Sequence, residues 1–389
     1  MRHLAEHNDC CGCSACVSIC KQKAITFVVD SEGFKYPSVD DNKCIDCGLC
    51  ELACPVLQRE KNQDTGEPIN YYAGRLKDDK ILFNSSSGGA FSAIADWVFE
   101  QNGLVVGVGY DNDCVARHQI AYQKEDYESF RGSKYVQSEL EGVFPKVKEL
   151  LGNKQLVFFT GTPCQVEGLK CYLRKDYSNL ITADIICHGV PSPLIFKEYK
   201  DFAESLLGHK VVAINMRDKS VRGWLEPFSY RFVFDSGKSM VDPKCISSWS
   251  YAFFSEYINR PSCHHCRFCN LHRPGDFTIA DFWDYADNRP DIRDNRGTSL
   301  ILVNTKKGID ILGGKLSAAL DLYEITKEEA LQPNLQRPTP ELKNRNDFWQ
   351  YYYKYGFEKS YKKYLSPHIT IKTVIKKGLI MLLKILRLK

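Results

Sequence analysis

The sequence predicts a small α+β domain at the N-terminus, followed by a larger α/β region. Three observations support this division: a duplicated cysteine motif before residue 60, two short strand patterns between its halves, and a long stretch in which strand-like and helix-like segments alternate. A chain of 389 residues is also too long for one small core. More than one domain is therefore expected.

The first sixty residues repeat the spacing C-x2-C-x2-C-x3-C. The first copy comprises Cys10, Cys13, Cys16 and Cys20, and the second comprises Cys44, Cys47, Cys50 and Cys54, followed by Pro55. In this spacing the first three thiolates bind one cubane and the fourth binds the other. We therefore expect one 4Fe-4S cluster on Cys10, Cys13, Cys16 and Cys54, and a second on Cys44, Cys47, Cys50 and Cys20.

This pattern is that of a bacterial-type two-cluster ferredoxin module. Lys21 stands where the first copy would have a proline, but ligation does not depend on that ring. Structural zinc is the alternative, and eight cysteines in this double spacing argue against it. Cys11 is left over. Residues 24–30 and 34–40 read as two short strands around a turn.

Composition and charge narrow the class of protein. The chain has 43% hydrophobic and 26% charged residues, which is ordinary for a globular protein, and its net charge of +4 gives no support to nucleic-acid binding. Nine of the 17 cysteines precede residue 55 in ligand-like spacing, and the N-terminus lacks the apolar run of a secretory signal. We expect a protein of the reducing cytoplasm without a disulfide framework.

The larger region alternates two kinds of segment. Strand-like runs occur at residues 104–110, 156–161, 180–187, 211–216, 277–283 and 299–305, and helix-like segments at 90–103 and 142–154. We expect four parts: a two-cluster domain at 1–60, a linker at 61–75, an α/β domain at 76–330 and a helical tail at 331–389. Residues 369–389 form a basic amphipathic pattern that is too short to span a membrane. They predict a helix that lies on an anionic membrane face, at the inner side, or packs on protein.

Two segments of small residues are candidates for binding a cofactor. Residues 85–90, SSSGGA, open a predicted helix, whose N-terminal amides bind phosphate, although serine and glycine are also ordinary N-cap residues. Residues 132–138, GSKYVQS, add a cation, hydroxyls and a ring that could face an isoalloxazine or adenine, or could form a surface turn. The GxG at 107–109 lacks the third glycine of a dinucleotide fingerprint.

Four further cysteines have the count for a third 4Fe-4S cluster. They are Cys164 in GTPCQV, Cys187 in ICHGVPSP, and Cys263 and Cys266 in RPSCHHCRF. Their spacing is not diagnostic, because it extends over a hundred residues. The alternatives are zinc on Cys263, Cys266 and Cys269 with His264, His265 or His272, or simple buried thiols.

These motifs together resemble the family of coenzyme F-420 hydrogenase/dehydrogenase beta subunits, in the form with a ferredoxin module fused in front. The resemblance rests on SSSGGAFSAIA, GSKYVQS, FTGTPCQVEGLK, DIICHGVPSP, MRDKSVRGW, RPSCHHCRF and DFTIADFW, and it covers about residues 8–310. It implies a noncovalent FAD in an α/β flavin-binding catalytic region, and an additional cluster on Cys164, Cys187, Cys263 and Cys266. Cys269 and Ala280 depart from the family pattern, and the latter leaves the role of Asp281 open.

By this resemblance nine residues are the candidates for contacting FAD: Ser87, Gly88, Gly89, Gly132, Ser133, Lys134, Tyr135, Gln137 and Thr162. FAD would join clusters, which pass single electrons, to a partner that exchanges a pair. The expected function is an iron–sulfur flavoprotein oxidoreductase that exchanges electrons with ferredoxin, a reduced deazaflavin or an unidentified small-molecule substrate. The alternative is a non-catalytic electron-transfer or redox subunit of a larger complex.

No proton donor follows from the sequence, although His188, Lys134 and Asp281 lie near the motifs. Arg217, Lys219 and Arg222 in MRDKSVRGW could attract an anionic substrate or form a solvated basic loop.

Overall fold

The computed structural model describes residues 4–59, 66–225, 228–283, 289–292 and 295–367. The amphipathic pattern predicted at 369–389 lies outside these residues. In the described part of the chain, every helix is too short or too polar to cross a membrane.

The N-terminal module consists of three short helices and a β-hairpin. It comprises α1 (Ala15–Ile19), β1 (Ile25–Val29), β2 (Lys35–Val39), α2 (Leu49–Leu52) and α3 (Pro55–Gln58). The hairpin pairs antiparallel from Ile25 with Val39 to Val29 with Lys35, as the sequence predicts. The repeat is also visible in the backbone, since α1 and α2 both follow a residue with φ near +70° (Ser14 and Gly48).

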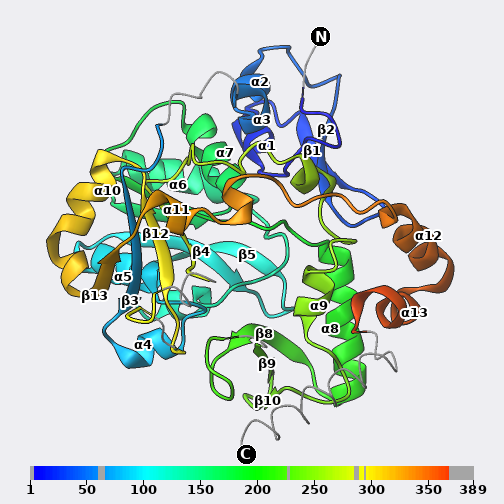
Figure 1. Cartoon of the computed structure of the whole chain (residues 1–389). Helices are drawn as coiled ribbons and strands as arrows, with labels where there is room; N and C mark the ends of the chain where they lie inside the picture. Colours follow the sequence, from blue (N-terminus) through cyan, green and yellow to red (C-terminus); the bar gives the residue numbers. More distant parts are fainter. Residues whose placement is uncertain (1–3, 60–65, 226–227, 284–288, 293–294, 368–389) are drawn as a thin grey trace, which may run out of the picture.

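The large domain is built on an eight-stranded mixed sheet with the order β13-β3-β12-β11-β7-β6-β4-β5. Figure 1 shows β13, β3 and β12 toward one end of this sheet and β4 and β5 toward the other. The strands are β3 (Asn70–Leu76), β4 (Leu104–Tyr110), β5 (Ala116–Ala121), β6 (Val157–Gly161), β7 (Leu180–Ile185), β11 (Phe277–Asp281), β12 (Ser299–Val303) and β13 (Leu320–Glu324). The four central strands, β11, β7, β6 and β4, run parallel. The α/β architecture predicted for this region is therefore present.

One predicted boundary differs from the structure. The sequence predicts a linker at 61–75, but Asn70–Leu76 form β3, which pairs antiparallel with both β12 and β13. The polar residues before residue 69 obscure the start of this strand in the sequence. The pattern of the strand itself also does not show that β3 pairs with two other strands.

Helices cover both faces of the sheet. α4 (Asp79–Phe83), α5 (Ala90–Glu100) and α10 (Lys306–Ile311) share a core with Val105 and Phe158, whereas α6 (Val143–Gly152) and α7 (Pro163–Leu173) share another with Val106 and Phe159. Successive strand residues thus point to opposite cores, as the two-residue period of a strand requires. Cys13, Ala15 and Ala53 of the N-terminal module belong to the second core.

A smaller antiparallel sheet lies beside the large one. It contains β8 (Val211–Asp218), β9 (Ser229–Phe234) and β10 (Ser239–Val241), packed with α8 (Pro193–Leu207), α9 (Trp249–Phe253), α12 (Arg345–Tyr355) and α13 (Phe357–Ser360). The run at 211–216 therefore belongs to this separate sheet. Phe348 and Trp349 of α12 are buried in its core, so the described part of 331–389 packs as domain structure.

The remaining short elements connect these layers. They are η1 (Asp126–Phe130), η2 (Pro261–His265), η4 (Leu312–Leu316), α11 (Lys327–Ala330), η5 (Pro333–Leu335) and η6 (Tyr361–Leu365).

The hairpin turn of the N-terminal module is fastened to the large domain. The Arg345 guanidinium donates to both carboxylate oxygens of Glu32 and to the carbonyl of Asn259. Gly33 has a φ of +86°, and a Cβ built there would lie 2.3 Å from the Cβ of Leu194 at the start of α8. Only glycine allows this approach.

We expect Gly33→Ala to destabilise the protein by about 1–3 kcal/mol more than Gly208→Ala. Both glycines have a positive φ, which is unfavourable for alanine, but only at Gly33 would the new methyl group also clash with a neighbour, Leu194 of α8. Gly208, which ends α8 with a φ of +71°, has no atom within 4 Å of its Cβ position. Urea unfolding of the two variants measures the difference. Equal midpoints would contradict a close contact at Gly33.

Candidate functional site

The eight cysteines of the N-terminal repeat surround two separate cavities. Cys10, Cys13, Cys16 and Cys54 line one, and Cys20, Cys44, Cys47 and Cys50 line the other. This is the interleaved grouping that the spacing predicts. The short helices α1 and α2 carry the fourth thiol of each copy across to the other cavity.

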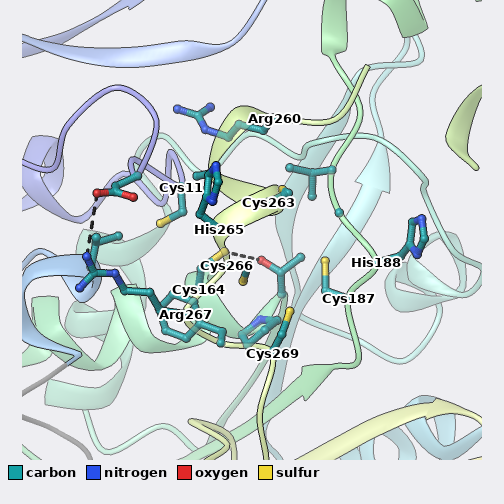
Figure 2. Close-up of a pocket in the computed structure, with 18 residues that line it drawn as sticks. Cys11, Cys164, Cys187, His188, Arg260, Cys263, His265, Cys266, Arg267 and Cys269 are labelled. Carbon is teal, nitrogen blue, oxygen red and sulfur yellow. Dashed lines mark hydrogen bonds and ion pairs between the residues drawn. The ribbon is translucent and has the colours of Figure 1, made fainter. Parts of the chain in front are cut away.

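A third cavity lies between the N-terminal module and the large domain. Figure 2 shows six cysteines from four chain segments around it: Cys11, Cys164, Cys187, Cys263, Cys266 and Cys269. The structure thus brings together the four cysteines predicted for a third cluster and adds Cys11 and Cys269. The space between these side chains, including its opening to solvent, is about 600 Å³.

The lining of this cavity fits an iron–sulfur cluster, because six thiols surround it and Cys thiolates are the usual ligands of a cubane. Among the described residues, no group of three His, Cys, Asp or Glu side chains is placed to hold a single metal ion.

Two of the thiols follow adjacent parallel strands of the large sheet. Cys164 lies in the first turn of α7, directly after β6, and Cys187 lies two residues beyond β7. Thr162 caps α7 in a capping box with Gln165, and its Oγ1 is 3.1 Å from Cys164 Sγ. The carboxyl ends of neighbouring parallel strands meet at one edge, which is where α/β folds place their sites.

The other predicted ligands lie on a loop held by a buried ion pair. Arg273 donates to Asp184 Oδ1 through Nε (3.0 Å), and its Nη1 and Nη2 donate to the carbonyls of Phe268 (2.8 Å) and Ile185 (2.9 Å). The side chains of Asp184 and Arg273 are 0% and 1% exposed. This pair therefore ties the loop with Cys263, Cys266 and Cys269 to the end of β7.

We expect Asp184→Asn to cost about 3–5 kcal/mol of unfolding free energy, because Arg273 would be left buried without a counter-charge. The matched control is Asp201→Asn, which removes a partner of Lys197 on the exposed face of α8 and should cost about 0–1 kcal/mol. Urea unfolding at pH 7 compares them. Equal losses in the two variants would show that the Asp184–Arg273 pair does not hold the loop.

Burial keeps most of these thiols protonated in the absence of a metal. It raises the pKa of Cys187 well above its ordinary value and that of Cys263 to about 12. The hydrogen bond between Cys266 and Cys269 lowers the pKa of Cys266 to about 7 and raises that of Cys269. Metal binding at this site would therefore release protons.

The ligand set predicted for the third cluster does not include Cys11 and Cys269. For Cys269 there is a signal in the sequence, since Cys263, Cys266 and Cys269 repeat the C-x2-C-x2-C spacing. Cys11 has none, because its approach to Cys164 joins residues far apart in the sequence.

The candidate flavin contacts fall into two groups. Ser133 meets the first small-residue segment, since its N–H donates to Ser86 Oγ (2.7 Å). No atom lies within 4 Å of the Cβ position at Gly132.

The candidates at 87–89 pack against the start of β12. Ser87 Oγ donates to the carbonyl of Thr298, and a Cβ at Gly88 would lie 2.3 Å from Ser299 N. Gly89 is the N-cap of α5.

Of the other candidates, Gln137 and Thr162 lie at the cysteine cavity, whereas Tyr135 and Lys134 have other neighbours. Gln137 donates to the carbonyl of Cys11 (3.2 Å), and Thr162 lines the cavity. Tyr135 stacks on Phe253 at 4.3 Å between ring centroids. Lys134 Nζ donates to the carbonyls of Ser129 and Arg131, and burial lowers its pKa to about 7.

The basic motif at 217–222 is solvated only in part: Arg222 is exposed and pairs with Asp242, whereas Arg217 and Lys219 are buried. The Arg217 side chain is 2% exposed, pairs with Asp281 at 3.1 Å and lies over the ring of Phe228. Lys219 Nζ donates to the carbonyls of Leu82 and Ser87. These two cations are therefore used inside the fold, and Asp281 is the structural partner of Arg217, where it also accepts from Trp224 Nε1.

Models of known protein families match most of the chain. Residues 71–144 match the N-terminal part of the coenzyme F420 hydrogenase/dehydrogenase beta subunit, and residues 154–328 match its C-terminal part. The chain belongs to the family of coenzyme F420 hydrogenase/dehydrogenase beta subunits. Residues 9–57 match a 4Fe-4S dicluster domain, so the protein carries a ferredoxin-like iron–sulfur domain in front of its α/β region.

Individual relatives are distant. The chain is 21% identical over 362 residues to one subunit of the F(420)H(2) dehydrogenase of Methanosarcina mazei, with 86% of this chain and 98% of that protein covered. An uncharacterized protein of Methanocaldococcus jannaschii is 26% identical over 200 residues, which cover 43% of this chain and 54% of that protein. A chain of the F420-reducing [NiFe] hydrogenase complex from Methanosarcina barkeri superposes with a TM-score of 0.46 and 18% identity, over 77% of this chain and 91% of that one.

Proposed function

We propose that this protein is an iron–sulfur flavoprotein oxidoreductase with three 4Fe-4S clusters and one noncovalent FAD. The clusters would be held by Cys10, Cys13, Cys16 and Cys54, by Cys20, Cys44, Cys47 and Cys50, and by Cys164, Cys187, Cys263 and Cys266. Cubanes supply one-electron transfer, and FAD supplies the step between single electrons and a pair.

The main support for this proposal is that the cavity of the Cys10 set and the six-cysteine cavity share lining residues. Cys11 and Val56 line both the cavity of Cys10 and the six-cysteine cavity. The cavity of Cys44, by contrast, shares no described lining residue with either. Its Cys47 is exposed. These features favour a linear relay in which electrons enter or leave at the Cys44 set, pass the Cys10 set, and reach the third cluster.

Contacts next to the third cavity support FAD at its far side. Tyr135 stacks on Phe253, which lies 5.3 Å from the ring of His188, and His188 lines the cavity. The segment that carries Tyr135 also meets Ser86 through Ser133. A flavin held by the open backbone at Gly132 and by Ser133 would thus lie near the last cluster, with Ser87, Gly88 and Gly89 shaping the helix end beside it.

The partner at the flavin is a deazaflavin, ferredoxin or a small molecule. The name of the Methanosarcina mazei relative supports the deazaflavin. Anaerobic mixing with reduced deazaflavin, reduced ferredoxin or NADPH tests this choice, because the donor that acts bleaches the bound flavin. Bleaching by none of them would contradict the electron chain.

Cofactor content of anaerobically purified protein tests the proposal itself. We expect about twelve iron atoms, from three clusters of four, and one FAD per chain. About eight iron atoms without flavin would contradict it and favour a non-catalytic electron-transfer protein. About eight iron atoms with one zinc would instead give the third site to zinc.

Two cysteine variants locate the third cluster. Cys164→Ser should lower the iron content by about four atoms, since it removes a predicted ligand. Cys269→Ala, in the same cavity, should keep the wild-type content. Iron loss in the alanine variant with retention in the serine variant would reassign the ligand set to the cysteines of the 263–269 loop.

A further inference from the structure

We propose that Arg260 is the fixed counter-charge of the cluster on Cys10, Cys13, Cys16 and Cys54, and that it raises the reduction potential of this cluster. The inference rests on the iron–sulfur part of the proposed function. It does not require FAD, the third cluster or any particular substrate.

The Arg260 guanidinium reaches from the large domain into the N-terminal module. Nε donates to the carbonyl of Cys10 at 2.6 Å, and Nη2 donates to the carbonyl of Lys35 at 3.0 Å. Nη2 also lies 3.8 Å from Cys10 Sγ, within hydrogen-bond range for sulfur. Arg260 therefore touches both the backbone and the thiol of a predicted ligand.

A nearby anion would favour the burial of this cation. Arg260 is 0% exposed. Three other buried arginines have a carboxylate partner, namely Arg217 with Asp281, Arg273 with Asp184, and Arg345 with Glu32, whereas Arg59 and Arg75 donate to neutral oxygens such as the carbonyls of His272 and Ile292. Within the described part of the chain, no carboxylate forms an ion pair with Arg260. An unpaired buried charge is costly, and a cubane held by four thiolates is negatively charged.

The surroundings hold the guanidinium in one orientation. It stacks over the ring of Tyr36 at 4.2 Å, and its Nη1 donates to Gln137 Oε1 at 3.0 Å. Gly12, with a φ of +67°, leaves room for the guanidinium, because a Cβ at this position would lie only 2.8 Å from Arg260 Nη1. A hydrogen bond to sulfur and a fixed positive charge are both recognised means of tuning a cluster.

The sign of the effect follows from electrostatics. Reduction adds one negative charge to the cluster, and a cation beside it stabilises the reduced form more than the oxidised form. Arg260 therefore raises the potential of the Cys10 cluster. The carbonyl of Arg260 also accepts a hydrogen bond from the N–H of Cys263 at 2.9 Å. Arg260 therefore also orients the backbone of the loop that carries Cys263 toward the third cavity.

The test is a potentiometric titration of the anaerobic full-length protein, followed by electron paramagnetic resonance. For Arg260→Gln we expect the ratio of reduced to oxidised Cys10 cluster at a fixed potential to fall about tenfold, which is 59 mV for one electron. The cluster on Cys44 serves as the internal reference and should not shift. Arg260→Lys keeps the charge and should restore most of the difference.

Arg222→Gln is the matched control, because it removes a half-exposed arginine, paired with Asp242, beside the small sheet. It should leave both potentials unchanged. An unchanged potential in Arg260→Gln, or an equal drop in the lysine variant, would overturn the inference while leaving the cofactor content intact. If the glutamine variant fails to assemble the cluster, the lysine variant decides: assembly at the wild-type potential supports the inference, and loss overturns it.

Discussion

The distance from the two N-terminal cluster sites to the third cysteine cavity depends on how the N-terminal module packs against the large domain. Three buried arginines make that contact from different elements. Arg59 bonds Asn270 and His272 beside the cysteine loop, Arg345 of α12 bonds the hairpin turn at Glu32, and Arg260 bonds Cys10. Cys13 and Ala15 complete a core with α6 and α7. The module is therefore built into the large domain, and a relay through it has fixed geometry.

This packing explains why the third cavity lies where it does. Its wall comprises the ends of β6 and β7, the loop held by Arg273, and Cys11 of the module. None of these segments alone could surround a cluster. The fold and the site thus stabilise each other: the ion pair of Asp184 with Arg273 orients the loop, and the loop presents Arg260 to the module.

Local features of this protein can be predicted from its sequence. The ligand repeat, the hairpin at 24–40 and most strands of the large sheet follow from spacing and period. Contacts between distant segments do not follow in this way. The pattern before β3 predicts a linker, the run at 211–216 lies in a separate sheet, and Arg217 and Lys219 are buried where a solvated loop was one expectation. Burial of a cation depends on partners such as Asp281, which lies 64 residues away from Arg217 in the sequence.

The central claim is that the Cys10 cluster and the third cluster are neighbours. Electron paramagnetic resonance of the fully reduced protein tests it most directly, because two nearby paramagnetic clusters split each other's signals. The Cys10 and Cys44 clusters lie in one small module and are expected to couple with each other, so the decisive comparison is with Cys164→Ser. We predict that this substitution removes one coupling from the wild-type spectrum and retains the Cys10 and Cys44 signals. A wild-type spectrum whose splittings are unchanged by that substitution would contradict the relay.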